Sequence, residues 1–118
     1  MSAAHNNLLD AALAVAGVQA AAIIELNRHA LARSNVAELS ETELAPVWRH
    51  VADTMEVSAH HRLSALQMRW IFDGALVYCL RRGDGRLLAV IATRESDRPF
   101  DTQAAEQLFD EFRQMRSA

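Results

Sequence analysis

Apolar side chains recur along the chain with two different periods, and the changes of period mark the expected elements. From Asn7 to Ala16 they follow the spacing of one helix face, and Gly17 stands where a helix C-cap would lie. The stretch from Val18 to Leu26 is almost continuously apolar, and a more polar run over 30–35 follows a short Asn-Arg-His turn. This pattern predicts a short helix and then a β-hairpin.

The clearest helix start in the chain lies at residues 40–43, whose sequence Ser-Glu-Thr-Glu fits a capping box. Leu39 and Leu44 are placed to form the hydrophobic staple that often accompanies such a box. Apolar residues then recur at steps of three and four as far as Met55. The pattern predicts an amphipathic helix that ends near Ala59.

From Leu63 onward the period changes to two, which predicts three strands joined by tight turns. The strands are expected over 63–72, 75–82 and 86–93. The Asp73-Gly74 pair between the first two is typical of a hairpin turn whose central residues both have a positive φ. A final helix is expected after Asp101, a favourable N-cap, and its apolar stripe runs to Met115.

The two strands over 20–26 and 87–92 are apolar on both faces, so both faces must be covered. With three amphipathic helices available, we expect an α/β (α+β) fold in which a five-stranded antiparallel sheet is sandwiched between helices. The order of elements is helix-β-β-helix-β-β-β-helix. We expect one domain over residues 7–116 after a flexible N-terminus of residues 1–6.

Composition and charge narrow the class of protein. Hydrophobic residues make up 51% of the chain and charged residues 23%, a globular mixture. The net charge of −3 argues against a nucleic-acid partner, and no apolar run approaches the roughly 18 residues of a membrane span. All basic residues are Arg, and Ala is abundant, which indicates a GC-rich, bacterial genome. The single cysteine, Cys79, cannot form an internal disulfide and favours a cytoplasmic location.

Candidate catalytic and metal-binding groups are sparse. The segment Gly83-Asp84-Gly85 lacks the following helix that a phosphate-binding loop requires. His60 and His61 would point in different directions on a helix, which favours a solvated helix end over a metal-binding or pH-sensing role. Cys79 lies in mid-strand, as a buried structural cysteine usually does. We therefore expect no catalysis, no metal and no cofactor.

Three arginines, Arg81, Arg82 and Arg86, flank the turn at 83–85. They could contact an acidic partner or a phosphate. Hairpin tips are also commonly charged simply because they are solvated, and this is the role that we expect. The sequence alone assigns no function to these arginines.

The order of elements resembles that of roadblock (dynein light-chain type) domains. The resemblance rests on the short helix ending at Gly17, the strand–turn–strand from Ile23 to Ser34, the long second helix, and a meander that ends in Leu87-Leu88-Ala89-Val90-Ile91. It implies a sheet in strand order 2-1-5-4-3. It also implies that the second helix covers one face and the terminal helices cover the other.

The same resemblance implies a way of working. Family members typically pair their third strands edge to edge and pack their second helices together, and bacterial members often accompany small Ras-like GTPases. We therefore expect a non-catalytic homodimeric adaptor or regulator that binds or regulates such a GTPase. The positions that match the dimer or partner interface are Trp48, Val51, Met55, Met68, Trp70 and Phe72.

Two other classes of protein stay open. A PAS- or GAF-like small-molecule sensor also places helices around an antiparallel sheet, but it needs an internal cavity, whereas the central strands here are expected to be filled. A nucleic-acid-binding module that uses the hairpin arginines would show salt-dependent binding. The sequence identifies neither the partner nor the pathway.

Overall fold

The computed structural model describes residues 3–27, 29–37, 39–60, 67–94 and 100–115, with the backbone alone at 59 and 60. The five strands form one antiparallel sheet in the order β2-β1-β5-β4-β3, which confirms the order that the resemblance implied. The elements follow the predicted sequence: α1 (Ala3–Ala14), β1 (Val18–Ile24), β2 (Ala30–Ser34), α2 (Glu41–His60), β3 (Gln67–Ile71), β4 (Ala75–Arg81), β5 (Leu87–Thr93) and α3 (Thr102–Gln114).

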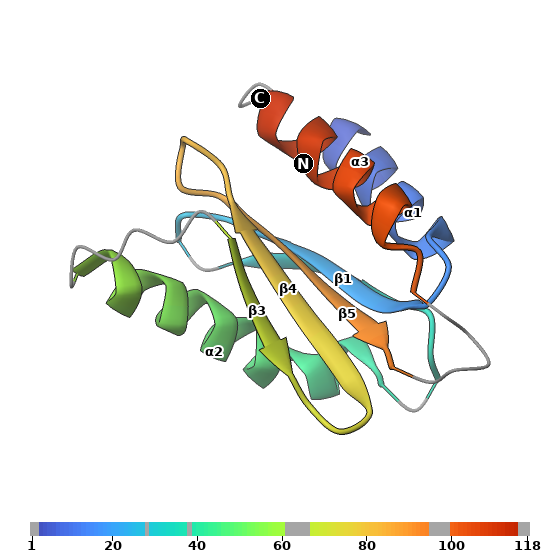
Figure 1. Ribbon diagram of the computed structural model, residues 1–118. Helices are drawn as coiled ribbons and strands as arrows, with labels where there is room; N and C mark the ends of the chain where they lie inside the picture. The colour runs from blue at the N-terminus through green and yellow to red at the C-terminus, as the bar shows by residue number, and fades with distance from the viewer. Residues whose placement is uncertain (1–2, 28, 38, 61–66, 95–99, 116–118) are drawn as a thin grey trace.

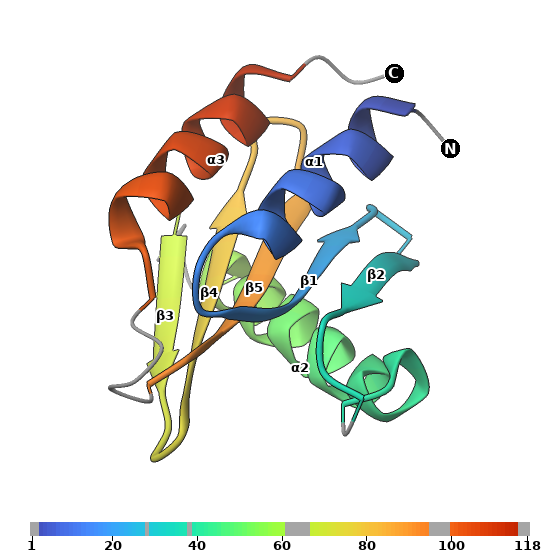
Figure 2. The same ribbon diagram turned by 90° about the vertical axis from the view of Figure 1, so that its right-hand side faces the viewer.

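Helices cover both faces of the sheet (Figure 1). On one face α1 and α3 lie side by side (Figure 2), where Phe109 and Phe112 of α3 pack on Ile23 and Val90. On the other face α2 packs on the alternate residues of the same strands, such as Ala22. Because strand side chains alternate between faces, β1 and β5 are buried on both sides, as their continuous apolar sequences predicted.

Side-chain caps fix where the two longer helices begin. Ser40 Oγ accepts a hydrogen bond from the Glu43 N–H at 3.1 Å and donates one to the Glu43 carboxylate at 3.3 Å. The N-cap predicted from the capping-box sequence is therefore confirmed. Asp101 is the predicted cap of α3, and its carboxylate accepts a hydrogen bond from the Ala104 N–H at 3.0 Å.

The first helix begins earlier than the apolar pattern predicted. α1 starts at Ala3 rather than Asn7, so residues 3–6, expected in a flexible N-terminus, are helical. Two polar side chains in this turn have tertiary partners. His5 is buried, and the Asn6 side chain accepts a hydrogen bond from Arg33 Nη2 at 2.7 Å. Contacts between distant segments, which a periodicity does not record, extend the helix.

The turn between β3 and β4 forms where it was predicted but with a different backbone. Phe72 N–H donates to the Ala75 carbonyl at 2.9 Å and closes a two-residue hairpin over Asp73-Gly74. Gly74 does not have a positive φ, so the expected turn type is wrong. The left-handed glycine of the meander is instead Gly85, with a φ of +91° in the turn between β4 and β5.

Gly17 joins α1 to β1 in a conformation that only glycine suits. Its φ is +87°, and a Cβ at this position would lie 2.6 Å from the Cα of Phe100, just before α3. Its carbonyl accepts a hydrogen bond from the Thr93 N–H at 2.8 Å. The turn is thus held between the end of β5 and the start of α3.

Two of the three hairpin arginines, Arg82 and Arg86, form an ion-pair network around Asp84. The Asp84 carboxylate accepts hydrogen bonds from Arg82 at 3.1 and 2.9 Å and from Arg86 Nη1 at 2.8 Å. Arg86 also pairs with Glu25 through Nε, and His5 Nδ1 lies 3.8 Å from the other Glu25 oxygen. The expected solvated role is therefore wrong for Arg86 and above all for Arg82, which is only 5% exposed.

Arg82 also fastens the β4–β5 hairpin to α3. Its guanidinium carbon lies 4.7 Å from the centroid of the Phe112 ring, and its Nη1 donates to the Phe112 carbonyl at 3.5 Å. The hydrogen bond from Arg82 is the main reason why the pKa of Asp84 lies well below its usual range, and Arg86 lowers this pKa further. The network is a structural tie between the hairpin, α1 and α3.

Replacing Gly17 by Ala should lower the free energy of unfolding by about 1–3 kcal/mol, because the new side chain is strained at a positive φ and meets backbone atoms. Gly74→Ala is the matched control, since nothing lies within 4 Å of its added Cβ. The control should stay within about 0.5 kcal/mol of the wild type in urea denaturation. Equal losses in the two variants would show that the turn at Gly17 is not constrained as described.

Replacing Asp84 by Asn should lower the free energy of unfolding by about 1–3 kcal/mol near neutral pH, because two arginines lose a charged partner. A carboxyl whose pKa is lowered by folding contributes stability above its ordinary pKa of about 4, and this contribution is lost as the pH falls. The difference between wild type and variant should therefore shrink in acid. Asp110→Asn, at an exposed pair with Arg113, should change stability by less than about 1 kcal/mol. A variant difference that stays constant down to about pH 3 would contradict the assignment.

Candidate interaction surface

One edge of the sheet, formed by β3, has unpaired backbone groups. Phe72 pairs with Ala75 by a hydrogen bond, so the hydrogen-bonded positions of β3 on β4 are Phe72, Trp70 and Met68. The N–H and C=O groups of Arg69 and Ile71 therefore point away from the sheet and have no partner among the described residues. Such a row of backbone groups is a template for pairing with another strand.

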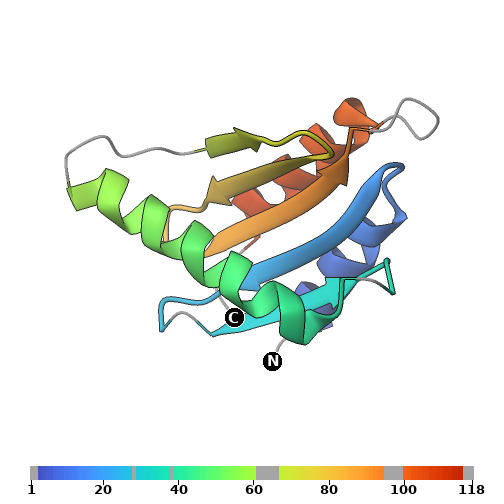
Figure 3. The ribbon, with the colours of Figure 1, turned by 90° about the horizontal axis from the view of Figure 1, so that it is seen from below.

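Apolar side chains flank this free edge. Ile71 is 58% exposed and Phe72 is 53% exposed. Met68 and Trp70 are half-buried at the margin of the cluster beneath α2, on the face to which alternation also assigns Phe72. We call Met68, Trp70 and Phe72 the β3 strip. α2 lies against β2, β1 and β5 and leaves β3 outside its span (Figure 3).

The three α2 residues expected in an interface do not lie at this surface. Trp48, Val51 and Met55 are buried against the chain's own sheet, in the cluster that includes Ala89. In the single chain these residues are at most 3% exposed, so they have almost no surface to offer a partner. The apolar period of α2 therefore marks the face that packs on the sheet, while an interface would need a different side of the helix.

Helix geometry identifies the residues on the flank of α2 that is turned toward β3. Ala45 and Arg49, on the opposite flank, line a cleft with Ala32 of β2. Val47 and Thr54 lie across the helix from that flank, and Val47 packs at the margin of the core. These two positions, rather than the buried ones, lie on the flank of α2 that is turned away from β2.

Ile71 is the interface candidate that the sequence analysis missed. It lies on the opposite side of the strand from the β3 strip, among the exposed residues Gln67 and Arg69. A large apolar residue at a solvent-facing position of a strand is the signal that could have identified it.

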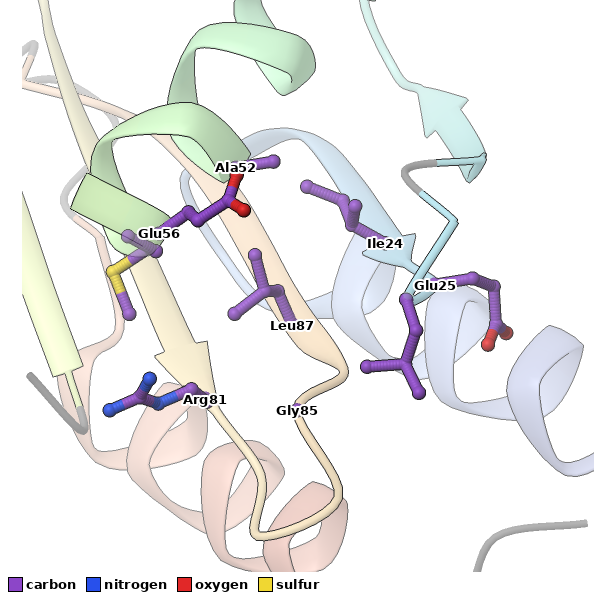
Figure 4. A pocket seen from close by; sticks show the side chains of 9 residues that line it. Ile24, Glu25, Ala52, Glu56, Arg81, Gly85 and Leu87 are labelled. Atoms are coloured by element: carbon purple, nitrogen blue, oxygen red, sulfur yellow. The ribbon is translucent and has the colours of Figure 1, made fainter. Parts of the chain in front are cut away.

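A small cleft lies beside the C-terminal half of α2, between this helix, the end of β1 and the start of β5 (Figure 4). Its volume is about 230 Å³. Ile24 and Leu87 line its apolar part, Arg81 lies at one end, and Glu25 turns away toward α1. Arg81 is half-buried here. The space is smaller than the roughly 300–1,000 Å³ of typical small-molecule sites.

The described residues supply little reactive chemistry. Burial raises the pKa of the Cys79 thiol to about 12, so that the group stays protonated and unreactive. No group of three or more His, Cys, Asp or Glu side chains in the described ranges is arranged to hold a metal ion. The His60 side chain and His61 lie outside the described residues. Among the helices that the structure describes, none is long and apolar enough to cross a membrane.

Solved structures share this architecture. Myxococcus xanthus MglB superimposes with a TM-score of 0.69 at 14% sequence identity, over 94% of this chain and 93% of that chain. A roadblock/LC7 domain from Streptomyces avermitilis gives 0.60 at 18% identity, over 90% and 92%. A structure described as MglB with a tetrameric arrangement gives 0.64 at 13% identity, over 96% and 90%.

Sequence comparison adds no relative to these structural matches: no protein-family model matches the chain, and no curated protein is significantly similar. The likeness is therefore one of fold. It agrees with the strand order and with the placing of α2 opposite α1 and α3. The chain has the fold of a roadblock/LC7 domain.

Proposed function

We propose that this chain is a non-catalytic cytoplasmic adaptor that forms a homodimer through β3 and binds or regulates a small Ras-like GTPase. The free edge of β3, flanked by the exposed side chains of Ile71 and Phe72, is the observation that carries the dimer. The GTPase part rests on the resemblance to roadblock domains and on the shared fold.

The two edges of the sheet differ in what they would gain from a partner. β2, at the far edge, has residues that are all half-buried, and Leu31 is its one large apolar side chain. α2 packs beside this strand. β3 instead combines outward-pointing backbone groups with the β3 strip and Ile71. Pairing with a second copy would satisfy those backbone groups and remove apolar surface from water in one step.

Self-association also has a precedent among proteins of this fold, since one neighbour is described as MglB with a tetrameric arrangement. The sensor alternative has less support. The strands β1 and β5 are filled on both faces by buried side chains, and the clefts beside α2 and beside the α1–β1 turn are open to solvent. We therefore favour protein binding over binding of a small molecule inside the sheet.

Replacing Phe72 by Arg should weaken the dimer at least about tenfold, because a charge would be placed in an apolar contact, at a cost of about 1.4 kcal/mol or more. Leu26→Arg is the matched control. Leu26 is 67% exposed and lies in the β1–β2 turn, on the far side of the sheet. Light scattering over a range of concentrations should show dimers for the wild type and Leu26→Arg and monomers for Phe72→Arg. A wild type that stays monomeric at every concentration would refute the proposed dimer.

The GTPase is tested with the immobilised chain and extract from its native cells, supplied with a GTP analogue or with GDP. We expect mass spectrometry to identify a small Ras-like GTPase retained by the wild type and by Leu26→Arg. If a dimeric wild type retains no such GTPase with either nucleotide, the GTPase part of the proposal is wrong and the dimer part stands.

A further inference from the structure

The backbone of β3 restricts how two copies can pair, if the proposed dimer forms. In a two-fold antiparallel pair, one residue lies opposite its own copy. Hydrogen-bonded pairs can join only residues whose groups point outward, which are Gln67, Arg69 and Ile71. We call the residue that lies opposite its own copy the centre of the pairing. The exposed side chains of Ile71 and Phe72 lie at the end of the strand, so a pairing that covers them has its centre at Arg69 or at a residue nearer the Asp73-Gly74 turn.

Charge and strand length distinguish the remaining centres. A pair centred on Arg69 would place two arginines directly opposite each other, which is destabilising. A pair centred on Ile71 would reach the Asp73-Gly74 turn, where the chain leaves the sheet, after a single residue on that side. A pair centred on Trp70 avoids both problems.

We propose that two copies of the chain pair through β3 with Trp70 opposite Trp70 of the second copy. Residues 68–72 then form a continuous antiparallel ladder. Arg69 exchanges both backbone hydrogen bonds with Ile71 of the second copy, and the reverse pair does the same. Every outward-pointing group of these two residues gains a partner.

The side chains on the α2 face fit the same register. Met68 lies opposite Phe72 of the second copy, on either side of the central Trp70 pair, so the β3 strip is covered by its own copy. Aromatic and apolar cross-strand pairs of this kind stabilise a sheet. The Trp70 indole is already half-buried at the margin of the core, which limits the conformational freedom that it loses on pairing.

The opposite face fits in charge. Arg69 lies across from Ile71 of the second copy rather than from another arginine. Asp73, an exposed residue just beyond Phe72, lies diagonally from Arg69 of the second copy in this register, within reach of a long side chain. The register thus places an acidic group near each arginine at the rim of the interface.

Single cysteine substitutions test the register, and the buried native Cys79 does not interfere. Opposite residues at a non-hydrogen-bonded pair have Cα atoms about 4.5 Å apart, which suits a disulfide. Trp70→Cys should therefore form an intermolecular disulfide under mild oxidation. Arg69→Cys alone and Ile71→Cys alone should not, because each would be diagonal to its own copy, about 7–8 Å away.

A mixture of the Arg69→Cys and Ile71→Cys chains keeps Trp70 in place and should form a mixed disulfide that neither chain forms alone. Leu26→Cys controls for random collisions and should stay monomeric on a non-reducing gel. Linkage of Arg69→Cys or Ile71→Cys to itself would overturn the register. So would the absence of any linkage at these positions in chains that light scattering shows to be dimers. A monomeric wild type would instead refute the proposed dimer itself.

Discussion

The burial of β1 and β5 on both faces is the constraint on which the rest of the structure depends. A strand that is apolar on both sides must be covered on both sides, so the helices separate into two layers. The two faces are not equivalent. Small side chains such as Ala20, Ala22 and Ala89 face α2, whose Trp48 fills the space above them. Larger strand side chains, such as Ile23 and Val90, face α1 and α3. Both layers are close-packed, but strand side chains fill more of the space in the layer beneath α1 and α3.

The position of α2 decides which surface stays available to a partner. Because α2 lies over β2, β1 and β5, the strand farthest from it keeps a free edge and partly exposed apolar side chains. Two other conspicuous residues, Arg82 and Arg86 of the β4–β5 hairpin, stabilise the fold through Asp84 and Glu25. The molecule therefore separates a structural polar network at one end of the sheet from an apolar edge that suits a second copy.

The sequence predicted the fold well because its signals are local or periodic. The capping sequence at Ser40, the cap at Asp101 and the continuous apolar strands each have a direct physical meaning at one place in the chain. Two of the failures concern distant contacts. The burial of His5, which extends α1, depends on segments far away in sequence, and so does the role of Arg82 on Phe112.

The residues that the sequence analysis named for an interface lie in two different environments. An apolar residue such as Trp48 or Met55 shows only that a helix has a buried face, and the structure shows that this face is occupied by the sheet. Met68, Trp70 and Phe72 were named because the resemblance to roadblock domains implies pairing through the third strand, and their place in an interface stays a prediction. Ile71 was missed because its neighbours on the same face are polar, and the turn type at Gly74 was wrong because the Asp-Gly pair does not determine a single backbone conformation.

The central claim is that the free edge of β3 pairs with a second copy of the chain, and amide hydrogen exchange tests it most directly. The N–H groups of Arg69 and Ile71 point away from the sheet, as does that of Ala32 at the β2 edge. Residue-resolved exchange should become slow at Arg69 and Ile71 as the concentration rises, while exchange at Ala32 stays fast. Exchange at Arg69 and Ile71 as fast as at Ala32, at concentrations where the chain is dimeric, would contradict the account.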